Sequence, residues 1–246
     1  MRPAAVIAVA LAATGLSACQ SSQDKAAELR KQGDRALAGR EGLKIDKVNK
    51  DVDVLGSTIL SDKNGTAVVV EMQNKGKTDL ADVPIAIRLD DAKGKKVFAN
   101  DAPGLEQALV SMPLLPRGKD SYWVHNQVIP AAKPATLDVR VGEPVKPVEV
   151  PADPPHLTLS NIKLDRDADG AFLHGTVNNR SAIVQKRVTI FCVAKKGGKI
   201  VAAGRAVVEK LPPAEGLKKP IEFTVYFIGN PAGATLDFTV PPVALR

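Results

Sequence analysis

The same series of short sequence blocks occurs twice along the chain, and this repeat restricts the possible fold more than any other feature. In each half an Asn-Gly or Asp-Gly dipeptide, at residues 64–65 and 169–170, precedes an apolar run that ends in asparagine, at Asn74 and Asn179. Later blocks follow in the same order: Val83, Ile85 and Ile87 correspond to Val188, Ile190 and Cys192; Tyr122 and Val124 correspond to Phe223 and Val225; and Ala-Thr-Leu-Asp occurs at 135–138 and again at 234–237. Several matches in one order indicate two copies of one structural unit.

Short β-rich runs bounded by glycine, proline, asparagine and aspartate recur beyond residue 40, and no long stretch there has helical periodicity. Aromatic residues make up only 4% of the chain, so its cores must consist mainly of β-branched and aliphatic side chains. The predicted strands are 43–54, 66–73, 83–89, 95–99, 107–112, 121–128 and 135–141 in the first half, and 156–164, 171–177, 187–194, 200–208, 221–228 and 235–240 in the second. This pattern predicts an all-β fold.

Seven short strands in about a hundred residues are typical of an immunoglobulin-like antiparallel β-sandwich, and the repeat predicts two of them in tandem. Residues 143–155, which separate the two halves, contain five prolines. Because dense proline favours extended polyproline II, we interpret this segment as a linker. The expected domains are therefore residues 43–142 and residues 156–246.

The amino-terminal segment has the layout of an export signal. Arg2 precedes an apolar run from Ala4 to Leu16, which is too short to span a bilayer, and small residues follow before a cysteine. Leu16-Ser17-Ala18-Cys19 resembles the lipobox of bacterial lipoproteins. The resemblance implies removal of residues 1–18, a diacylglyceryl thioether on Cys19 and acylation of the new amino terminus, for example by palmitate. The alternative is an ordinary secretory signal cleaved after Ala18, which would leave Cys19 as a free thiol.

A lipidated Cys19 would anchor the protein to the extracytoplasmic face of a cell membrane, since two or more acyl chains make attachment stable. The sequence leaves open whether this is an inner or an outer membrane. Residues 19–42 are predicted to form a tether, and the helix formers within residues 23–37 indicate a short polar helix in it. Cys192 is the only other cysteine, so a lipidated Cys19 excludes an internal disulfide; its β-rich apolar run predicts a small buried side chain.

A second resemblance concerns Ile87-Arg88-Leu89-Asp90-Asp91 and the following Gly94. This segment resembles the Phe-x-Leu-Tyr-Asp strand and glycine turn of FxLYD-type domains from bacterial envelope proteins. The first half keeps Leu89 and Asp91, the second keeps Phe191, and residues 115–118 resemble the Pro-Gly turn of that family. The resemblance covers residues 56–141 and 157–240. It implies a sandwich fold and a non-catalytic role, without a known ligand.

Candidate chemistry is sparse. Asp165, Asp167 and Asp169 before Gly170 resemble the start of a calcium loop, but Thr176 stands where such a loop needs a bidentate glutamate. We therefore predict a hairpin turn there, with calcium binding as the alternative, and no metal site. The three histidines have no close metal-ligand spacing, and neither a nucleophile elbow nor a phosphate loop is present. The sequence predicts no enzyme and no cofactor.

Two groups of side chains are candidates for binding. Trp123 alternates with Tyr122, and if Tyr122 faces the core like Phe223, Trp123 lies on the opposite, partly exposed face, where a tryptophan can anchor a partner or be covered by a loop. Lysines also gather at predicted turns: Lys93, Lys95, Lys96, Lys195, Lys196, Lys199, Lys218 and Lys219. Of these, Lys95, Lys96, Lys195 and Lys196 are the candidates for contact with an anionic surface. The alternative is that they are solvated hairpin tips that protect strand edges.

The formal net charge of +7, or +6 after loss of Arg2 with the signal, is compatible with such a surface. Export makes nucleic acid an improbable partner. We therefore expect a lipid-anchored, non-enzymatic binding or scaffold protein of the bacterial cell envelope. Its expected partners are the membrane, through Cys19, and an envelope protein or anionic envelope polymer. The alternative is an accessory or substrate-binding subunit of an envelope enzyme or transport complex.

Overall fold

The strands of the first half pair into antiparallel sheets. The computed structural model describes residues 41–144, 148–168, 170–215 and 219–245, so the predicted signal peptide, Cys19 and the tether up to residue 40 lie outside the described residues. The strands are β1 (Val52–Asp62), β2 (Gly65–Asn74), β3 (Leu80–Asp90), β4 (Lys96–Ala99), β5 (Ser111–Leu115), β6 (Asp120–Val128) and β7 (Thr136–Val141), with a 3₁₀ helix, η1 (Gln107–Leu109), before β5. One sheet has the order β1-β2-β6, and in the other β3 pairs with β4, β5 and β7.

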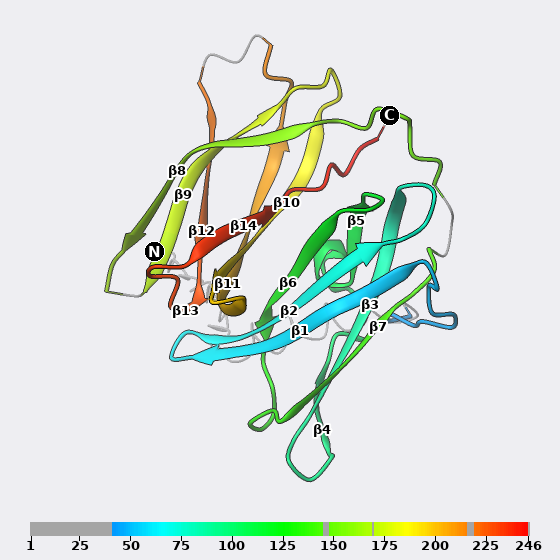
Figure 1. Ribbon diagram of the computed structural model, residues 1–246, viewed down its shortest axis with the longest axis vertical. Coiled ribbons are helices and arrows are strands. Elements are labelled where there is room, and N and C mark those ends of the chain that lie inside the picture. The colour runs from blue at the N-terminus through cyan, green and yellow to red at the C-terminus, as the bar shows by residue number, and fades with distance from the viewer. Residues whose placement is uncertain (1–40, 145–147, 169, 216–218, 246) are drawn as a thin grey trace, which may run out of the picture. The chain divides into compact units, whose positions relative to one another are not determined.

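The second half repeats this arrangement. Its strands are β8 (Leu157–Arg166), β9 (Ala171–Asn179), β10 (Gln185–Lys196), β11 (Lys199–Leu211), β12 (Ile221–Tyr226), β13 (Ile228–Gly229) and β14 (Thr235–Thr239). They form the sheets β12-β9-β8 and β13-β11-β10-β14 (Figure 1). The prediction of an all-β fold with antiparallel sheets is confirmed. Within the described residues, no helix has the length and apolarity that crossing a membrane requires.

The first strand does not span residues 43–54, as the sequence predicts. It runs from Val52 to Asp62, and before it Val48 forms only an isolated bridge to Gly142. The reason is the turn that follows. Asp62 pairs with Gly65 across a tight hairpin, and the pairing continues back to Val52 opposite Asn74, so the position of the turn fixes the extent of β1.

Asn74 and Asn179, which end β2 and β9, are completely buried and make the same hydrogen bonds in the two halves. Each side-chain oxygen accepts the backbone N–H two residues later. Each side-chain nitrogen donates to two backbone carbonyls, those of Thr78 and Leu115 for Asn74 and those of Ile183 and Leu211 for Asn179. These amides close the turn into the next strand and connect it to the other sheet of each half, through Leu115 of β5 and Leu211 of β11.

A second repeated feature is a residue with positive φ near the start of β3 and of β10. Asp82 has φ of 51° and Arg187 has φ of 53°. Each interrupts the strand pairing locally, while the register on its two sides stays the same. Positive φ is costly for residues other than glycine, although aspartate and asparagine tolerate it best.

β10 is buried on both faces. Every residue from Val188 to Ala194 is completely buried. Val188, Ile190, Cys192 and Ala194 belong to the core of the second half, whereas Phe191 and Val193, with Ala203 of β11, belong to the core of the first half. Strands covered on both faces have continuous apolar runs rather than alternating ones, as this segment does.

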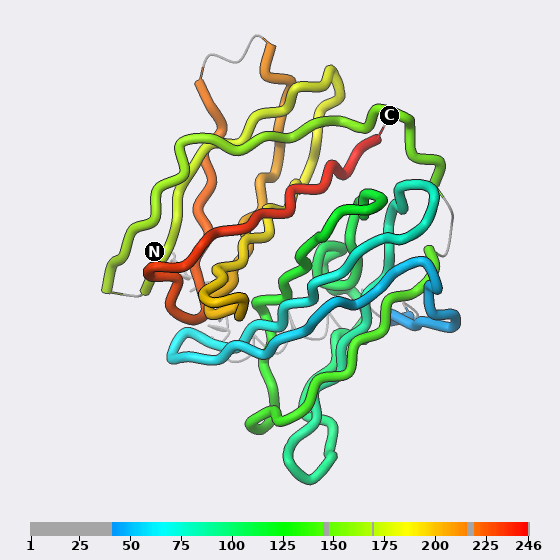
Figure 2. Tube along the Cα trace, in the orientation of Figure 1, coloured from blue at the N-terminus to red at the C-terminus, as the bar shows by residue number. Residues whose placement is uncertain are grey.

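The two halves are therefore in direct contact along β2, β6, β10, β11 and β14. Tyr122 N of β6 donates to Thr239 Oγ1 of β14, and in Figure 2 the red end of the chain passes beside the green trace of β6. Residues 41–246 form one compact unit by their contacts. The proline-rich segment thus joins two halves that touch, and the domain boundaries remain a prediction.

Candidate functional site

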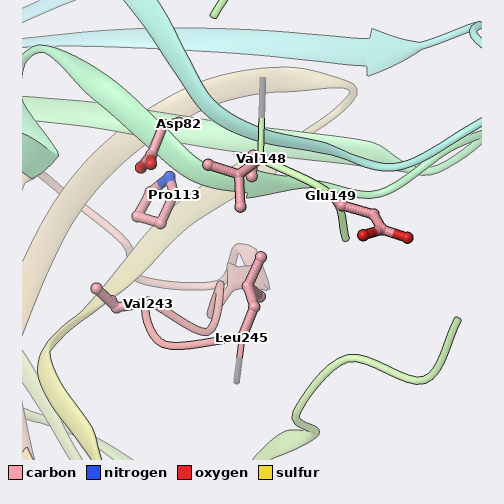
Figure 3. A pocket seen from close by; sticks show the side chains of 7 residues that line it. Asp82, Pro113, Val148, Glu149, Val243 and Leu245 are labelled. Atoms are coloured by element: carbon pink, nitrogen blue, oxygen red, sulfur yellow. The ribbon is translucent and has the colours of Figure 1, made fainter. Parts of the chain in front are cut away.

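Three adjoining cavities lie along the β3–β5 side of the first half, and Val148 lines all of them. Their volumes are about 200, 580 and 470 Å³. We call them together the Val148 groove. The smallest cavity connects the other two through shared residues and is lined by Ala81, Asp82, Pro113, Val148, Glu149, Val243 and Leu245. These residues come from β3, β5, the proline-rich segment and the carboxyl-terminal segment (Figure 3).

Asp82, the residue of β3 with positive φ, lines this groove. Ala81 and Val83 pair with Leu114 and Met112 of β5, so Asp82 lies opposite Pro113 outside the regular pairing. Figure 3 shows Asp82 beside Pro113 and Val148, with Val243 and Leu245 across the cavity. Pro113 has no backbone N–H. A strand added to the edge at β5 would therefore lack a hydrogen-bond donor at this point.

Asp82 is exposed at the edge of the groove. The neighbouring groove walls still desolvate its carboxyl in part, which raises the pKa of Asp82 above the ordinary value. Among the described residues, none forms a hydrogen bond or ion pair with this carboxylate. Glu41 lines the largest cavity together with Asp82, whereas Lys77 and Arg117 line the cavity at the other end. The groove therefore combines apolar walls with a carboxylate available to a cation.

The prediction of a partly exposed Trp123 is wrong. Trp123 is completely buried in the first core, and its Nε1 donates to the carbonyl oxygen of Ala108 at 2.8 Å. The sequence comparison of the halves was offset by one residue. Ser121 pairs with Met72 as Ile221 pairs with Val177, so counting from the equivalent asparagines makes Trp123, rather than Tyr122, equivalent to Phe223.

Tyr122 instead faces the second half, where it meets Lys195. Lys195 Nζ lies 2.8 Å from Glu71 Oε1 and 2.6 Å from Tyr122 Oη, and Tyr122 Oη donates to the same Glu71 oxygen. Burial disfavours the ammonium charge, but the bonds to Glu71 and Tyr122 outweigh it and raise the pKa of Lys195 above its ordinary value. The sequence predicts Lys195 as a contact for an anionic surface. In the structure its ammonium pairs with Glu71 where the two halves meet.

The other lysine candidates lie in or next to exposed turns. Lys95 lies in the β3–β4 turn, Lys96 is the first residue of β4, with its Nζ 3.9 Å from Asp101 Oδ2, and Lys196 is the last residue of β10 before the β10–β11 turn. An exposed pair at this distance contributes little to stability. Contact with an anionic surface remains a prediction for these three residues.

A second ion-pair group joins the halves near η1. Arg205 of β11 donates from Nη2 to Glu106 Oε2 at 2.9 Å and from Nε to Asn126 Oδ1 at 2.9 Å. Arg187 Nη2 lies 3.2 Å from Glu106 Oε1. Burial alone would raise the pKa of Glu106, but Arg205 and Arg187 together lower it. The sequence offered no signal for this group because its members lie far apart in the chain.

The acidic segment at residues 165–170 adopts the predicted hairpin between β8 and β9. Asp167 N donates to the Gly170 carbonyl, and Gly170 N donates to Asp167 Oδ1. Asp165 is engaged by Lys163 Nζ at 3.4 Å, and Asp169 lies outside the described residues. Within the described part, no group of three or more metal-ligating side chains occurs.

Two further buried side chains have shifted pKa values. Cys192 is completely buried, and burial, with a smaller effect of Asp237, raises the pKa of its thiol above the ordinary value. His125 is buried between Phe98 and Trp123, with ring centroids 5.5 and 5.8 Å away. Burial, with a smaller effect of the Arg205 charge, lowers the pKa of His125 to about 4.

Comparison with known proteins adds no name to this geometry: no protein-family model matches the chain, and no curated protein matches it.

Proposed function

We propose that the protein is a lipid-anchored, non-enzymatic binding or scaffold protein on the extracytoplasmic face of the bacterial cell envelope. In this proposal a short tether at residues 19–42 carries two FxLYD-like, immunoglobulin-like sandwiches at residues 43–142 and 156–246. The membrane is reached through lipidated Cys19. The partner is an envelope protein, and exposed lysines such as Lys95, Lys96 and Lys196 add attraction to an anionic polymer.

The Val148 groove is the observation that carries the binding role. Elsewhere the partly buried acids Glu71 and Glu106 have cationic partners within the chain. Asp82 presents a carboxylate that no described residue pairs with, among apolar walls and in a cavity of the size that suits ligands. The export signal and its Leu-Ser-Ala-Cys segment support placement of this groove outside the cytoplasm.

The anchor is tested by the mass of the protein isolated from membranes. We expect the mature chain to begin at Cys19 and to carry the added mass of a diacylglyceryl group, and Cys19→Ser to abolish both the modification and normal processing. A mature wild-type protein whose mass equals that of its polypeptide would contradict the anchor.

The binding role is tested by cross-linking in intact cells. We expect a cross-linked partner of the wild-type protein to be lost in Val148→Arg, which places a long charged side chain in the groove. Ile129→Arg is the matched control, since Ile129 is 85% exposed and lines none of the three cavities of the groove. Equal cross-linking by both variants would show that the groove does not bind the partner.

A further inference from the structure

We infer that the Val148 groove recognises a basic side chain flanked by apolar residues on a partner polypeptide, and that Asp82 pairs with the cation. This inference rests on the proposed binding function and specifies the chemistry of the partner. It does not depend on lipidation of Cys19.

The two halves provide an internal comparison for Asp82. Asp82 and Arg187 occupy equivalent positions in the two halves, with nearly equal φ of 51° and 53°. In the second half the charge at this position is paired within the chain, because Arg187 lies 3.2 Å from Glu106 and 2.9 Å from Glu209. In the first half no described residue pairs with Asp82, which is exposed at the groove. The carboxylate of Asp82 is thus accessible to a cation from a partner.

Charge complementarity selects a cationic occupant. Asp82 shares the largest cavity of the groove with Glu41, and among the described residues no lysine or arginine lines that cavity. Lys77 and Arg117 line a different cavity of the groove. A basic group is therefore attracted to the cavity that holds Asp82, an arrangement that contributes more to specificity than to affinity.

The walls select apolar neighbours for that cation. Val148 and Val243 remain 45% and 43% exposed, and with Pro113 they line the cavity next to Asp82. Covering such side chains removes apolar surface from water, which is worth about 25 cal/mol per Å². A partner whose basic residue lies between aliphatic residues would cover these walls and neutralise Asp82 together.

Recognition must occur through side chains rather than through strand addition. β5 is a terminal strand of its sheet, but Pro113 at its centre lacks the N–H that an added strand would need. The strand pairing between β3 and β5 is also interrupted at Asp82 and Pro113. A short peptide with the right side chains is therefore an adequate probe.

The test measures fluorescence anisotropy of labelled peptides added to the full chain in detergent. The probes are Ala-Val-Lys-Val-Ala and Ala-Val-Glu-Val-Ala, each with blocked ends, so that they differ only at the central charge. We expect the lysine peptide to bind the wild-type protein at least fivefold more tightly than the glutamate peptide. A bond between charged groups gives an effect of about this size or larger.

Asp82→Asn should weaken binding of the lysine peptide at least fivefold. Asparagine tolerates positive φ as aspartate does, so the backbone conformation is retained while the charge is removed. Asp53→Asn is the matched control: it removes a carboxylate of β1 that pairs with Lys75 and does not line the groove, and it should bind the lysine peptide as wild type does. Failure of the wild-type protein to prefer the lysine peptide, or equal binding by Asp82→Asn, would overturn the inference.

The outcome is separable from that of the proposed function. If cross-linking in cells is lost in Val148→Arg but retained in Asp82→Asn, the groove binds a partner and the inference of a basic residue fails. If neither variant affects cross-linking, the proposed binding role of the groove fails.

Discussion

Asn74 and Asn179 show how one polar side chain stabilises a β core that has few aromatic residues. Each amide serves two backbone carbonyls and one backbone N–H in a completely buried position. Removing such a side chain leaves several buried backbone groups without hydrogen bonds. Each unsatisfied group lowers the stability of the fold by about 1–3 kcal/mol.

Asn179→Ala should therefore lower the free energy of unfolding by about 3 kcal/mol or more, measured by urea denaturation. Asn178→Ala is the matched control, because its neighbouring amide makes only an exposed bond of 3.4 Å to Ser160 Oγ. We expect this control to stay within about 0.5 kcal/mol of wild type. Equal loss in the two variants would show that the buried bonds do not determine the effect.

His125 should make stability depend on pH. Its pKa of about 4 in the folded protein lies below the usual value of 6.5, so between these values the unfolded chain binds a proton that the folded chain does not. Stability should thus be constant, as far as His125 is concerned, above about pH 7 and fall as the pH decreases toward 4, by up to about 3 kcal/mol.

The measurement is the free energy of unfolding from pH 7.5 to pH 4 for wild type and His125→Phe. In His125→Phe the free energy of unfolding should depend less steeply on pH, because the contribution of His125 is gone. His156→Phe, which changes an exposed histidine, controls for removal of an imidazole. An unchanged slope in His125→Phe would contradict the assignment.

At the scale of single elements, close approach of strands depends on Gly204. Gly204 pairs with Cys192, and a Cβ there would collide with the carbonyl oxygen of Tyr226 and with Val225. Gly204→Ala should lower the free energy of unfolding by about 1–3 kcal/mol because of overpacking, and thermal melts measure the loss. At Gly56 of β1 the nearest atom to a new Cβ is Glu71 Oε2 at 3.9 Å. Gly56→Ala should therefore be neutral or slightly stabilising in the same thermal melts. Equal effects of Gly204→Ala and Gly56→Ala on stability would contradict the role of close packing at Gly204.

Most strands could be predicted because turn residues and alternation are local signals. Asn64-Gly65 marks the β1–β2 hairpin, and the match of Asn74 with Asn179 was confirmed by their common hydrogen bonds. The offset at Trp123 arose because short matching blocks do not define the register between strands. Strand pairing does, and it depends on contacts distant in sequence.

The candidate site could not be predicted in the same way. Asp82, Pro113, Val148 and Val243 come from four separate segments, and none of them belongs to a motif. The role of Lys195 was missed for the same reason, since Glu71 lies 124 residues away from it. Composition reveals that such charges exist, but only the fold determines which of them meet.

At the scale of the whole molecule, β10 connects the stability of the two halves. Phe191 belongs to a strand of the second half and packs in the core of the first, where the single tryptophan, Trp123, also lies. Phe191→Ala should cost about 3–5 kcal/mol and should shift the unfolding midpoint reported by Trp123 fluorescence as much as the midpoint from circular dichroism. Tyr226→Ala, at a side chain 58% exposed, should shift both midpoints only slightly. Fluorescence that is unaffected by Phe191→Ala would mean that the halves unfold independently.

The burial of β10 on both faces also has a consequence for biosynthesis. When β6 of the proposed exported chain has emerged outside the cytoplasm, the face that Phe191 and Val193 will cover still lacks its cover, and roughly 80 further residues must follow before β11 is complete. Until then the first half exposes an apolar sheet, and exposed apolar surface promotes aggregation. A chaperone that holds the emerging chain through that interval would improve the yield of the protein.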